Sequence, residues 1–298
     1  MRRRDFLGTL AGLAMSGAAP AAERMRTRPI PSSGEALPVI GLGTWQTFDV
    51  GGDAAARAPL AEVLQALFDA GGRVVDSSPM YGSSEAVVGE LCEPLGLCGP
   101  LFMASKVWTQ GRENGAREMQ RSIERMRAGR MDLMQVHNLV DVEAHTRTLF
   151  DWKAQKRVRY IGVTHYTASA HAAVMRALKT QQYDFVQINY SLDEREAAEG
   201  VLPLAQQLGV AVIVNRPFGE GGYFRRTRGK PLPPFAAELG IASWAQYALK
   251  WIVSHPAVTC AIPGTSKPAH MRDNAGAGFG ALPDDATRRH MAEYYASL

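Results

Sequence analysis

Short apolar runs alternate with longer amphipathic segments along most of this chain of 298 residues. Segments with helical periodicity cover Pro59 to Ala70, Ala116 to Met126 and Ala170 to Leu178. Runs rich in β-branched and aromatic residues predict strands near eight positions: Val39, Val74, Phe102, Leu133, Tyr160, Phe185, Val212 and Thr259. Eight strand signals with intervening helices predict an α/β fold, a (β/α)8 or TIM barrel, rather than an open doubly wound sheet.

A short N-terminal β-hairpin is predicted ahead of these strands. Its arms are Pro29-Ile30 and Leu37-Pro38, and Ser32-Ser33-Gly34 lies between them as a turn. We expect this hairpin to close the floor of the barrel.

Three successive predicted strands end on an ionisable residue. Asp76, Lys106 and His137 each follow a short apolar run, and Tyr81 lies in the loop after Asp76. The strands of a parallel barrel all open their C-terminal ends on one face, where active sites are found. We therefore expect these four side chains to meet there.

An acid, a phenol, an ammonium and an imidazole at one site can protonate a carbonyl oxygen while a hydride arrives. A free tyrosine titrates at about pH 10, so Tyr81 needs a nearby cation such as Lys106. Asp76 would keep a buried Lys106 charged, and His137 would orient the carbonyl and share the oxyanion with Tyr81. Taken alone, a strand-end Asp or Lys is more often a solvated loop charge, and a lone His is more often a satisfied buried polar group, than a catalytic residue. The ordered set of four favours a carbonyl reductase.

This ordered set resembles the aldo-keto reductase family. The resemblance runs from Gly41-Leu42-Gly43-Thr44-Trp45 to Ile262-Pro263-Gly264-Thr265-Ser266-Lys267 and the helix that holds Asp273-Asn274. It implies an NAD(P)H-dependent oxidoreductase that reduces aldehydes and ketones, with catalytic residues Asp76, Tyr81, Lys106 and His137. No glycine-rich dinucleotide fingerprint follows the first strand, so the nucleotide would be held without a Rossmann fold.

The resemblance also implies where the cofactor lies. Thr164, His165 and Gln187 would hold the nicotinamide carboxamide, which needs a donor and an acceptor, although the family more often shows Ser-Asn at 164–165. The helix after Gly264 would bind phosphate at its N-terminus, and Lys267 with His270 or Arg272 would read a 2′-phosphate. NADPH is therefore favoured, with NADH as the alternative. The full set of expected cofactor contacts is Gly43, Thr44, Trp45, Asp76, Thr164, His165, Gln187, Asn215, Arg216, Pro217, Gly219, Thr265, Ser266, Lys267, His270 and Asn274.

The largest departure from the family follows the seventh strand. Many members place an aromatic residue at the position of Asn215, where it stacks on the nicotinamide ring. Arg216 could replace that platform with its guanidinium plane, or it could form a structural ion pair. Both interpretations stay open at this stage.

The first residues predict export. Arg2-Arg3-Arg4-Asp5-Phe6-Leu7 resembles a twin-arginine (Tat) signal, and an apolar stretch too short to span a membrane comfortably follows it to Ala19. Small residues at Ala19-Pro20-Ala21 suit cleavage after Ala21 or Ala22. We expect residues 1–22 to be a cleaved signal peptide and residues 23–298 to be a single barrel domain. The twin-arginine export machinery is then a partner, the location is the periplasm, and a folded chain would carry its cofactor with it.

Charge and cysteine content exclude several other classes. The formal net charge is +4, and residues 1–22 contribute three arginines and one aspartate, so about +2 remains. That balance predicts no nucleic-acid partner, and we expect a monomer without a stable membrane anchor. Cys92, Cys98 and Cys260 show no metal-ligand spacing, so no metal site is predicted. Cys92 and Cys98 are the local candidates for a disulfide, but we expect both thiols to be free.

Aromatic residues near the predicted strand ends indicate the substrate class. Trp45, Phe48, Met80 and Trp108 should form an apolar mouth, with Trp45, Tyr81, Trp108 and His137 contacting a small-molecule carbonyl substrate. A slow cofactor-sensing protein of the same fold remains an alternative, motivated by the missing aromatic at Asn215. An unrelated barrel hydrolase is disfavoured, because the chain has no metal-ligand cluster and no nucleophile elbow.

Overall fold

The computed structural model describes residues 24–298, and the predicted signal peptide therefore lies outside the described residues. The first elements are β1 (Thr27–Pro29) and β2 (Ala36–Pro38), which pair in antiparallel fashion. Gly34 in their turn has φ +77°, a conformation that costs glycine little. The predicted N-terminal hairpin is confirmed.

Parallel strands with intervening helices form the body of the protein. The strands are β3 (Leu42–Gly43), β4 (Val74–Asp76), β5 (Phe102–Val107), β6 (Met131–His137), β7 (Val158–Thr164), β8 (Phe185–Asn189), β9 (Ala211–Asn215) and β10 (Val258–Ala261). Each pairs with its neighbours in chain order. Bridges Ile40 to Ala261 and Gly43 to Gly264 bring the first strand beside the last. The predicted (β/α)8 barrel is confirmed.

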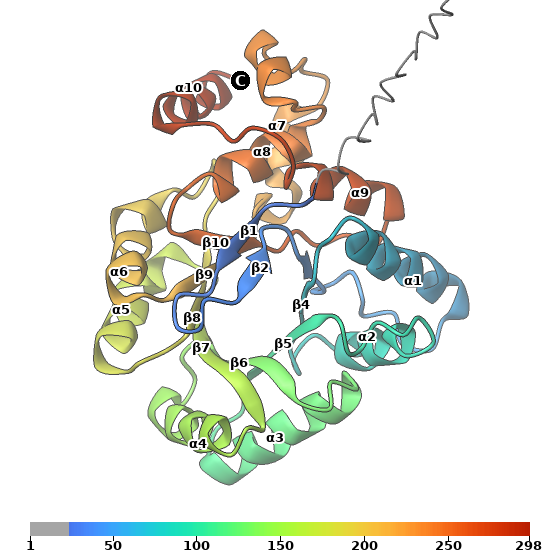
Figure 1. The fold of residues 1–298 in the computed structure, drawn as a ribbon, viewed down its shortest axis with the longest axis vertical. Helices are drawn as coiled ribbons and strands as arrows, with labels where there is room; N and C mark the ends of the chain where they lie inside the picture. Colours follow the sequence, from blue (N-terminus) through green and yellow to red (C-terminus); the bar gives the residue numbers. More distant parts are fainter. Residues whose placement is uncertain (1–23) are drawn as a thin grey trace, which may run out of the picture.

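Helices surround the strands in Figure 1. Those between consecutive strands are α1 (Ala54–Asp69), α2 (Ser84–Cys92), α3 (Arg112–Arg125), α4 (Val142–Ala154), α5 (His171–Thr180), α6 (Val201–Leu208), α7 (Gly222–Thr227) and α8 (Trp244–Val253), and α9 (Pro268–Gly276) and α10 (Asp285–Ala296) follow β10. Helix α1 begins before the predicted Pro59 because the Asp53 carboxylate accepts the amide hydrogens of Ala55 and Ala56, at 2.9 and 3.2 Å. Short 3-10 turns, η1 (Ala168–Ala170), η2 (Glu196–Glu199), η3 (Gly219–Gly221) and η4 (Pro234–Leu239), lie between these elements.

The apolar run near Val39 joins the hairpin to the barrel. The regular strand of this run starts at Leu42, three residues after the predicted Val39, and Val39 itself hydrogen-bonds on two sides. The amide of Val39 donates to the carbonyl of Arg26 at 3.0 Å, and the amide of Ala261 donates to the carbonyl of Val39 at 2.9 Å. The side chains of this run are buried in the hydrophobic core.

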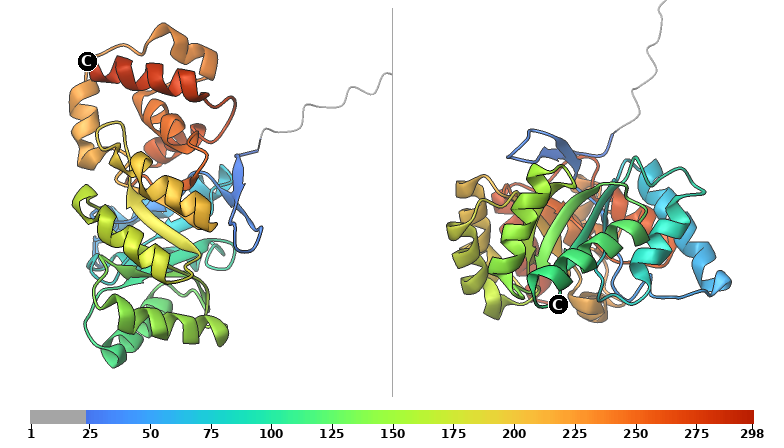
Figure 2. Two further views of the ribbon diagram at one scale, coloured as in Figure 1. Left: turned by 90° about the vertical axis from the view of Figure 1, so that its left-hand side faces the viewer. Right: turned by 90° about the horizontal axis from the view of Figure 1, so that it is seen from below.

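The interior of the barrel is filled by side chains. Strand residues point inward to form one buried cluster, made of Val74, Phe102, Ala104, Leu133, Tyr160, Phe185, Ala211, Ile213, Cys260 and Ile262. Ile30 and Leu37 of the hairpin belong to the same cluster. In Figure 2 the hairpin covers one end of the strands. The hairpin therefore closes the floor, and the opposite end is left for the site.

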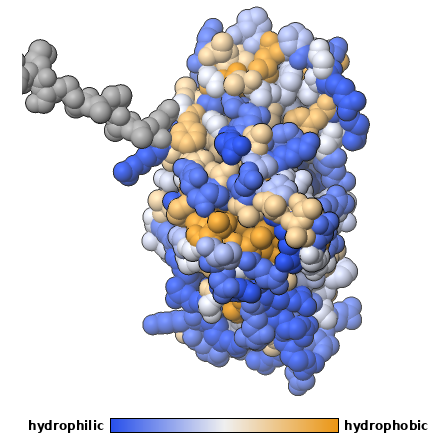
Figure 3. All heavy atoms as spheres, turned by 90° about the vertical axis from the view of Figure 1, so that its right-hand side faces the viewer, coloured by the Kyte–Doolittle hydropathy of each residue, from blue (hydrophilic) through white to orange (hydrophobic). Residues whose placement is uncertain are grey.

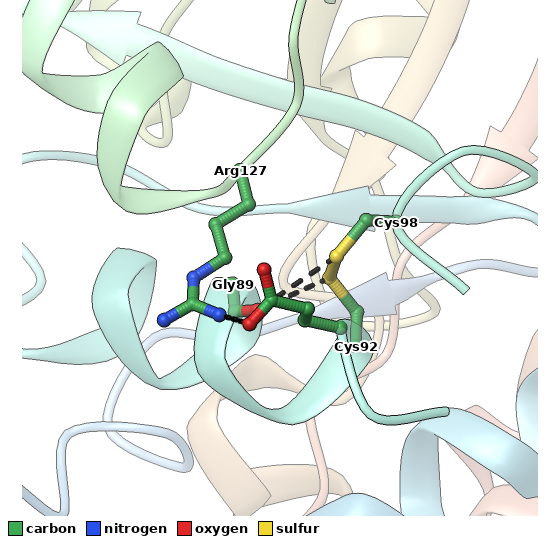
Figure 4. The surroundings of a disulfide bond; sticks show 5 residues. Gly89, Cys92, Cys98 and Arg127 are labelled. Carbon is green, nitrogen blue, oxygen red and sulfur yellow. Dashed lines mark hydrogen bonds and ion pairs between the residues drawn. A yellow bond between two sulfur atoms is a disulfide. The ribbon is translucent and has the colours of Figure 1, made fainter. Parts of the chain in front are cut away.

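Cys92 and Cys98 form a disulfide, which corrects our expectation of free thiols. Helix α2 ends at Cys92, and the chain turns back through Gly96 with φ +67°, which brings the two Cα atoms to 5.1 Å. Figure 4 shows both sulfurs beside the carbonyl of Gly89, and Arg127 paired with Glu93 next to them. Local backbone reversal, rather than long-range spacing, makes this pairing possible.

The surface on the side of α1 is mostly hydrophilic, with an apolar band across its middle (Figure 3). Within residues 24–298, no helix has the length and apolarity needed to cross a bilayer.

Candidate active site

The four predicted side chains meet at the end of the barrel opposite the hairpin. Asp76 is the last residue of β4, Lys106 lies near the end of β5, and His137 is the last residue of β6. Tyr81 lies in the loop that joins β4 to α2. Asp76, Lys106 and His137 are buried, and Tyr81 is partly exposed. The strand ends thus bring the set together as their positions in the sequence predict.

Lys106 is held as a buried ammonium. Its Nζ donates to Asp76 Oδ2 at 2.6 Å and to the carbonyl of Ser77 at 2.7 Å. The same Nζ lies 4.9 Å from the centre of the Tyr81 ring. Burial alone would lower the pKa of Lys106, but its interactions with the Asp76 carboxylate and with Tyr81 raise that pKa by more, so the net shift is upward. The lysine is therefore charged at neutral pH.

Tyr81 is held as a neutral phenol. Burial raises the pKa of Tyr81, and the Lys106 ammonium lowers it without cancelling the rise. Lys106 acts in the direction that the sequence analysis expects, but desolvation is the larger effect. The phenol is therefore protonated at neutral pH.

The second oxygen of Asp76 is satisfied by two amides. Asp76 Oδ1 accepts from Gln187 Nε2 at 2.8 Å and from Gln135 Nε2 at 3.3 Å. Gln187 Oε1 in turn accepts from Thr164 Oγ1 at 3.1 Å. Strands β4, β6, β7 and β8 are thus joined through one buried carboxylate. Gln135 was not among the predicted site residues, since it lies within a strand rather than at its end.

His137 is a neutral imidazole beside the phenol. Its ring centroid lies 5.9 Å from that of Tyr81 and 6.5 Å from that of Trp108. Its Nδ1 lies 3.1 Å from the hydroxyl of Ser78. Burial, with the charges of Lys106 and His165, lowers the pKa of His137 to about 2. The ring therefore offers one donor and one acceptor at neutral pH.

A cavity of about 660 Å³ opens over these groups. The predicted residues that line it are Gly43, Thr44, Trp45, Asp76, Met80, Tyr81, Trp108, His137, Thr164, Gln187, Asn215, Arg216 and Pro217. Phe48 does not line it, because its side chain is fully buried in the core between the sheet and the helices. The expectation that Phe48 forms part of the mouth is therefore wrong.

Several lining residues were missed by the sequence analysis. Tyr166 and Phe224 are exposed aromatics on the cavity wall, and Phe218 and Ile262 add apolar surface. Tyr166 directly follows the predicted Thr164-His165 and could have been found by the same strand-end rule. Phe224 lies on α7, far from any strand end in the sequence, and no pattern there pointed to the cavity.

Other expected cofactor residues do not line this cavity, although some directly adjoin residues that do: His165, Gly219, Thr265, Ser266, Lys267, His270 and Asn274. The imidazole of His165 packs against its neighbour Tyr166. Its Nδ1 accepts the Tyr166 amide hydrogen at 3.0 Å, and its ring stacks on the ring of that tyrosine. Lys267 is exposed at the start of α9, next to the cavity residue Gly264. Asn274 is buried within that helix. The α9 segment thus continues outward from the cavity.

Arg216 is engaged in ion pairs. Its guanidinium lies 3.2 Å from Glu194 and 2.5 Å from Glu220, and 5.8 Å from the ring of Tyr166. Of the two interpretations, the structure supports the ion pair. Asn215 beside it lines the cavity with no aromatic at that position, and its Nδ2 donates to the carbonyl of His165 at 3.0 Å.

Four cavity-lining residues carry a buried polar atom without a hydrogen-bond partner in the part of the chain that the structure describes. These atoms are Thr47 Oγ1, Asn138 Oδ1, Asn215 Oδ1 and Arg216 Nε. Unsatisfied buried polar atoms are rare in proteins and are often completed by a ligand or water. Such a lining fits a polar, hydrogen-bonding ligand such as the nicotinamide end of a dinucleotide. Across residues 24–298, no group of three or more His, Cys, Asp or Glu side chains is arranged to hold a metal ion.

A barrel with a lysine–aspartate pair behind a tyrosine, at the carboxyl ends of its strands, has the groups that a carbonyl oxidoreductase needs. Residues 39–290 match the Aldo/keto reductase family, and the chain belongs to that family. Methylglyoxal reductase YeaE from Escherichia coli is 28% identical over 260 residues, covering 84% of this chain and 89% of that protein.

Solved structures agree with this assignment. An aldo/keto reductase from Klebsiella pneumoniae in complex with NADP and acetate is 26% identical, with a TM-score of 0.74, and the match covers 88% of this chain and 93% of that one. A second aldo-keto reductase from the same organism, in complex with NADPH, is 25% identical with a TM-score of 0.76, covering 92% and 96%.

Proposed function

We propose that this protein reduces aldehydes or ketones to alcohols with NADPH, and that Tyr81 supplies the proton. The observation that carries the proposal is the Asp76–Lys106 pair, whose ammonium lies 4.9 Å from the ring of a protonated Tyr81 at the cavity floor. Asp76, Tyr81, Lys106 and His137 are the proposed catalytic set.

The chemistry divides between the cofactor and the chain. NADPH, when bound, would supply a hydride to the carbonyl carbon and would itself be oxidised to NADP⁺. The carbonyl electron pair moves to oxygen, which takes the phenolic proton of Tyr81. Lys106 stabilises the resulting phenolate, and Asp76 keeps the lysine charged and in place. His137, being neutral, can donate a hydrogen bond to the same oxygen without adding a second positive charge.

NADPH is proposed over NADH for two reasons. The Klebsiella pneumoniae relatives are solved with NADP and with NADPH. In this chain, Lys267 is exposed at the N-terminus of α9, where its ammonium and the helix dipole would both favour a phosphate. The nucleotide would then run from the cavity past Gly264 to α9.

The substrate class is a small carbonyl compound. Trp45, Met80, Trp108, Tyr166 and Phe224 are exposed around the cavity and give it an apolar rim. Methylglyoxal, which appears in the name of the Escherichia coli relative, is a suitable first substrate.

Export to the periplasm by the twin-arginine route remains part of the proposal. The twin-arginine pattern at Arg3-Arg4 lies outside the described residues, so its support comes from the sequence. The disulfide between Cys92 and Cys98 adds to that support, because such bonds persist in the bacterial periplasm and are rare in the cytoplasm. A folded, cofactor-loaded enzyme is the cargo that this route accepts.

The test compares the wild type with Tyr81→Phe. Carbonyl reduction is followed by NADPH consumption, and cofactor affinity by fluorescence titration. We expect the variant to lose nearly all turnover while its NADPH affinity stays almost unchanged, because the phenol acts in the transition state. Retention of more than about a tenth of kcat would contradict the role of Tyr81.

The same assay addresses the alternative of a slow cofactor-sensing protein. Asn215, which stands where many relatives carry a stacking aromatic, is the residue that favours this alternative. Tight NADPH binding by the wild type without consumption of NADPH, over a panel of aldehydes and ketones, would support sensing and reject the reductase.

A further inference from the structure

The hydroxyl of Ser78 contacts the imidazole of His137. The serine is fully buried in the loop between β4 and Tyr81, and its Oγ lies 3.1 Å from His137 Nδ1. The two residues are 59 positions apart in the sequence, and Ser78 does not itself line the cavity. A buried hydroxyl against one ring nitrogen can decide which nitrogen of a neutral imidazole carries the proton.

The surroundings of Ser78 fix the direction of this hydrogen bond. The amide of Met80 donates to Ser78 Oγ at 3.4 Å, and among residues 24–298 the only other hydrogen-bond partner of this oxygen is His137 Nδ1. His137 Nδ1 is therefore the one acceptor there for the Ser78 hydroxyl hydrogen, and the reverse direction would leave that buried hydrogen without an acceptor. In a neutral ring with Nδ1 as acceptor, the proton lies on Nε2.

The other ring nitrogen is free to meet a substrate. His137 Nε2 has no hydrogen bond to any residue in 24–298, and His137 lines the cavity next to Tyr81 and Trp108. An Nε2–H group donates to a carbonyl oxygen, whereas a bare Nε2 would place a lone pair against it. The state of Nδ1 therefore decides whether this imidazole attracts or repels the substrate.

We propose that Ser78 is a positioning residue that holds His137 in its Nε2–H tautomer and thereby makes the imidazole a hydrogen-bond donor to the substrate carbonyl. This inference rests on the proposed carbonyl reduction for its purpose, but the tautomer itself can be measured without turnover. Ser78 touches neither substrate nor cofactor and acts only through His137.

The first experiment is nuclear magnetic resonance of the wild-type protein with ¹⁵N-labelled histidine, with the His137 signals assigned from the His137→Gln variant. We expect Nε2 to carry the proton and Nδ1 to be unprotonated at neutral pH. A protonated Nδ1 would overturn the proposal. This measurement needs no change at Ser78, so it decides the matter even if variants at that position fold poorly.

The second experiment is kinetic. Ser78→Ala should lower kcat by about tenfold with NADPH affinity unchanged, and its His137 ¹⁵N signals should move toward a mixture of tautomers. Ser78→Cys, which keeps a weak donor of similar shape, should recover part of both effects. Equal kcat in Ser78→Ala and the wild type would overturn the proposal.

Ser84→Ala is the matched control. Ser84 is also buried, follows Tyr81 in the chain, and donates to the carbonyl of Thr44 at 3.4 Å without touching His137. Loss of a buried hydroxyl at Ser84 should leave the His137 signals and kcat unchanged. If Ser84→Ala moves both as far as Ser78→Ala does, the effect is general loosening and the proposal fails. If the wild type shows the Nε2–H tautomer but reduces no carbonyl compound, the tautomer assignment stands and the proposed function fails.

Discussion

The carboxylate of Asp76 lies 2.6 Å from the ammonium of Lys106, and both side chains are almost fully removed from solvent. Desolvation opposes each charge, and each partner offsets that cost for the other. The carbonyl of Ser77 accepts a further hydrogen bond from the Lys106 ammonium, and the side-chain amide of Gln187 donates one to the Asp76 carboxylate. Neither charge is therefore stable at this place without the other.

Removing one partner should be worse than removing both. Asp76→Asn leaves the Lys106 ammonium buried without a counter-ion and should lower the free energy of unfolding by about 3–5 kcal/mol. The double variant Asp76→Asn with Lys106→Met should be less destabilised than Asp76→Asn alone, because no unpaired charge remains. Urea unfolding of the wild type, both single variants and the double variant measures this coupling. Additive losses would show that the two charges are stabilised independently.

His137 should make the protein less stable in acid. Its pKa is lowered to about 2 in the folded state, against about 6.5 when unfolded. Above pH 6.5 neither state binds the proton. As the pH falls between these values only the unfolded state binds it, so the free energy of unfolding falls by up to about 1.4 kcal/mol per pH unit.

The matched variant is His137→Gln, which has no such proton to bind. Urea unfolding from pH 7 to pH 4.5 should show a shallower loss of stability in the variant than in the wild type. The pKa of His255 is also lowered by burial, to about 4, but this residue is present in both proteins and cancels in the difference. Parallel curves would mean that His137 is protonated in the folded state.

The carboxyl ends of these strands can be predicted from the sequence, because Asp76, Lys106 and His137 each interrupt an apolar run at or next to the last residue of a strand. The barrel then brings these side chains together, because all of its parallel strands end on the same face. No long-range information is needed to place these three side chains together.

Side-chain contacts that depend on the conformation of loops cannot be predicted from the sequence in the same way. Phe48 directly precedes an exposed loop segment yet points into the core, while Phe224 reaches the cavity from α7. The hydrogen bond from Ser78 to His137 and the disulfide between Cys92 and Cys98 depend on backbone turns that composition does not specify. Gly96, with φ +67°, lies in the turn between the two cysteines.

Lys267 should set the preference for NADPH. Its exposed ammonium makes no hydrogen bond or ion pair within residues 24–298, so it is available to a phosphate. Lys267→Ala should weaken NADPH binding by about tenfold or more, about 1.4 kcal/mol, and leave NADH binding nearly unchanged. Fluorescence titration with both cofactors measures this. Lys156→Ala, an exposed lysine at the hairpin end of the barrel, is the control. Equal losses for both cofactors would assign Lys267 to another part of the nucleotide.

The disulfide should stabilise the folded chain without affecting catalysis. Closing a loop of this length removes unfolded-state entropy worth about 2 kcal/mol. The variant with both Cys92→Ala and Cys98→Ala should lose about that much in urea unfolding and keep the kcat of the wild type. A reducing agent should lower the stability of the wild type to that of the variant and leave the variant unchanged, since its remaining Cys260 is buried and unpaired among residues 24–298. Unequal stabilities of the reduced wild type and the variant would point to lost packing at Cys92 rather than to the bond.

Export by the twin-arginine route is tested by changing Arg3 and Arg4 to lysine. A pore that takes folded cargo must recognise the signal first, and lysine cannot reproduce the planar donor geometry of guanidinium. We expect the variant to remain in the cytoplasm, unprocessed after Ala21 or Ala22, yet folded and able to bind NADPH. Because cytoplasmic thiols are kept reduced, Cys92 and Cys98 of the retained chain should react with a thiol label after unfolding, whereas those of the exported wild type should not. Cell fractionation combined with thiol labelling measures both the location of the chain and the oxidation state of the two cysteines. Equal processing and equal protection of the two cysteines in wild type and variant would reject this route.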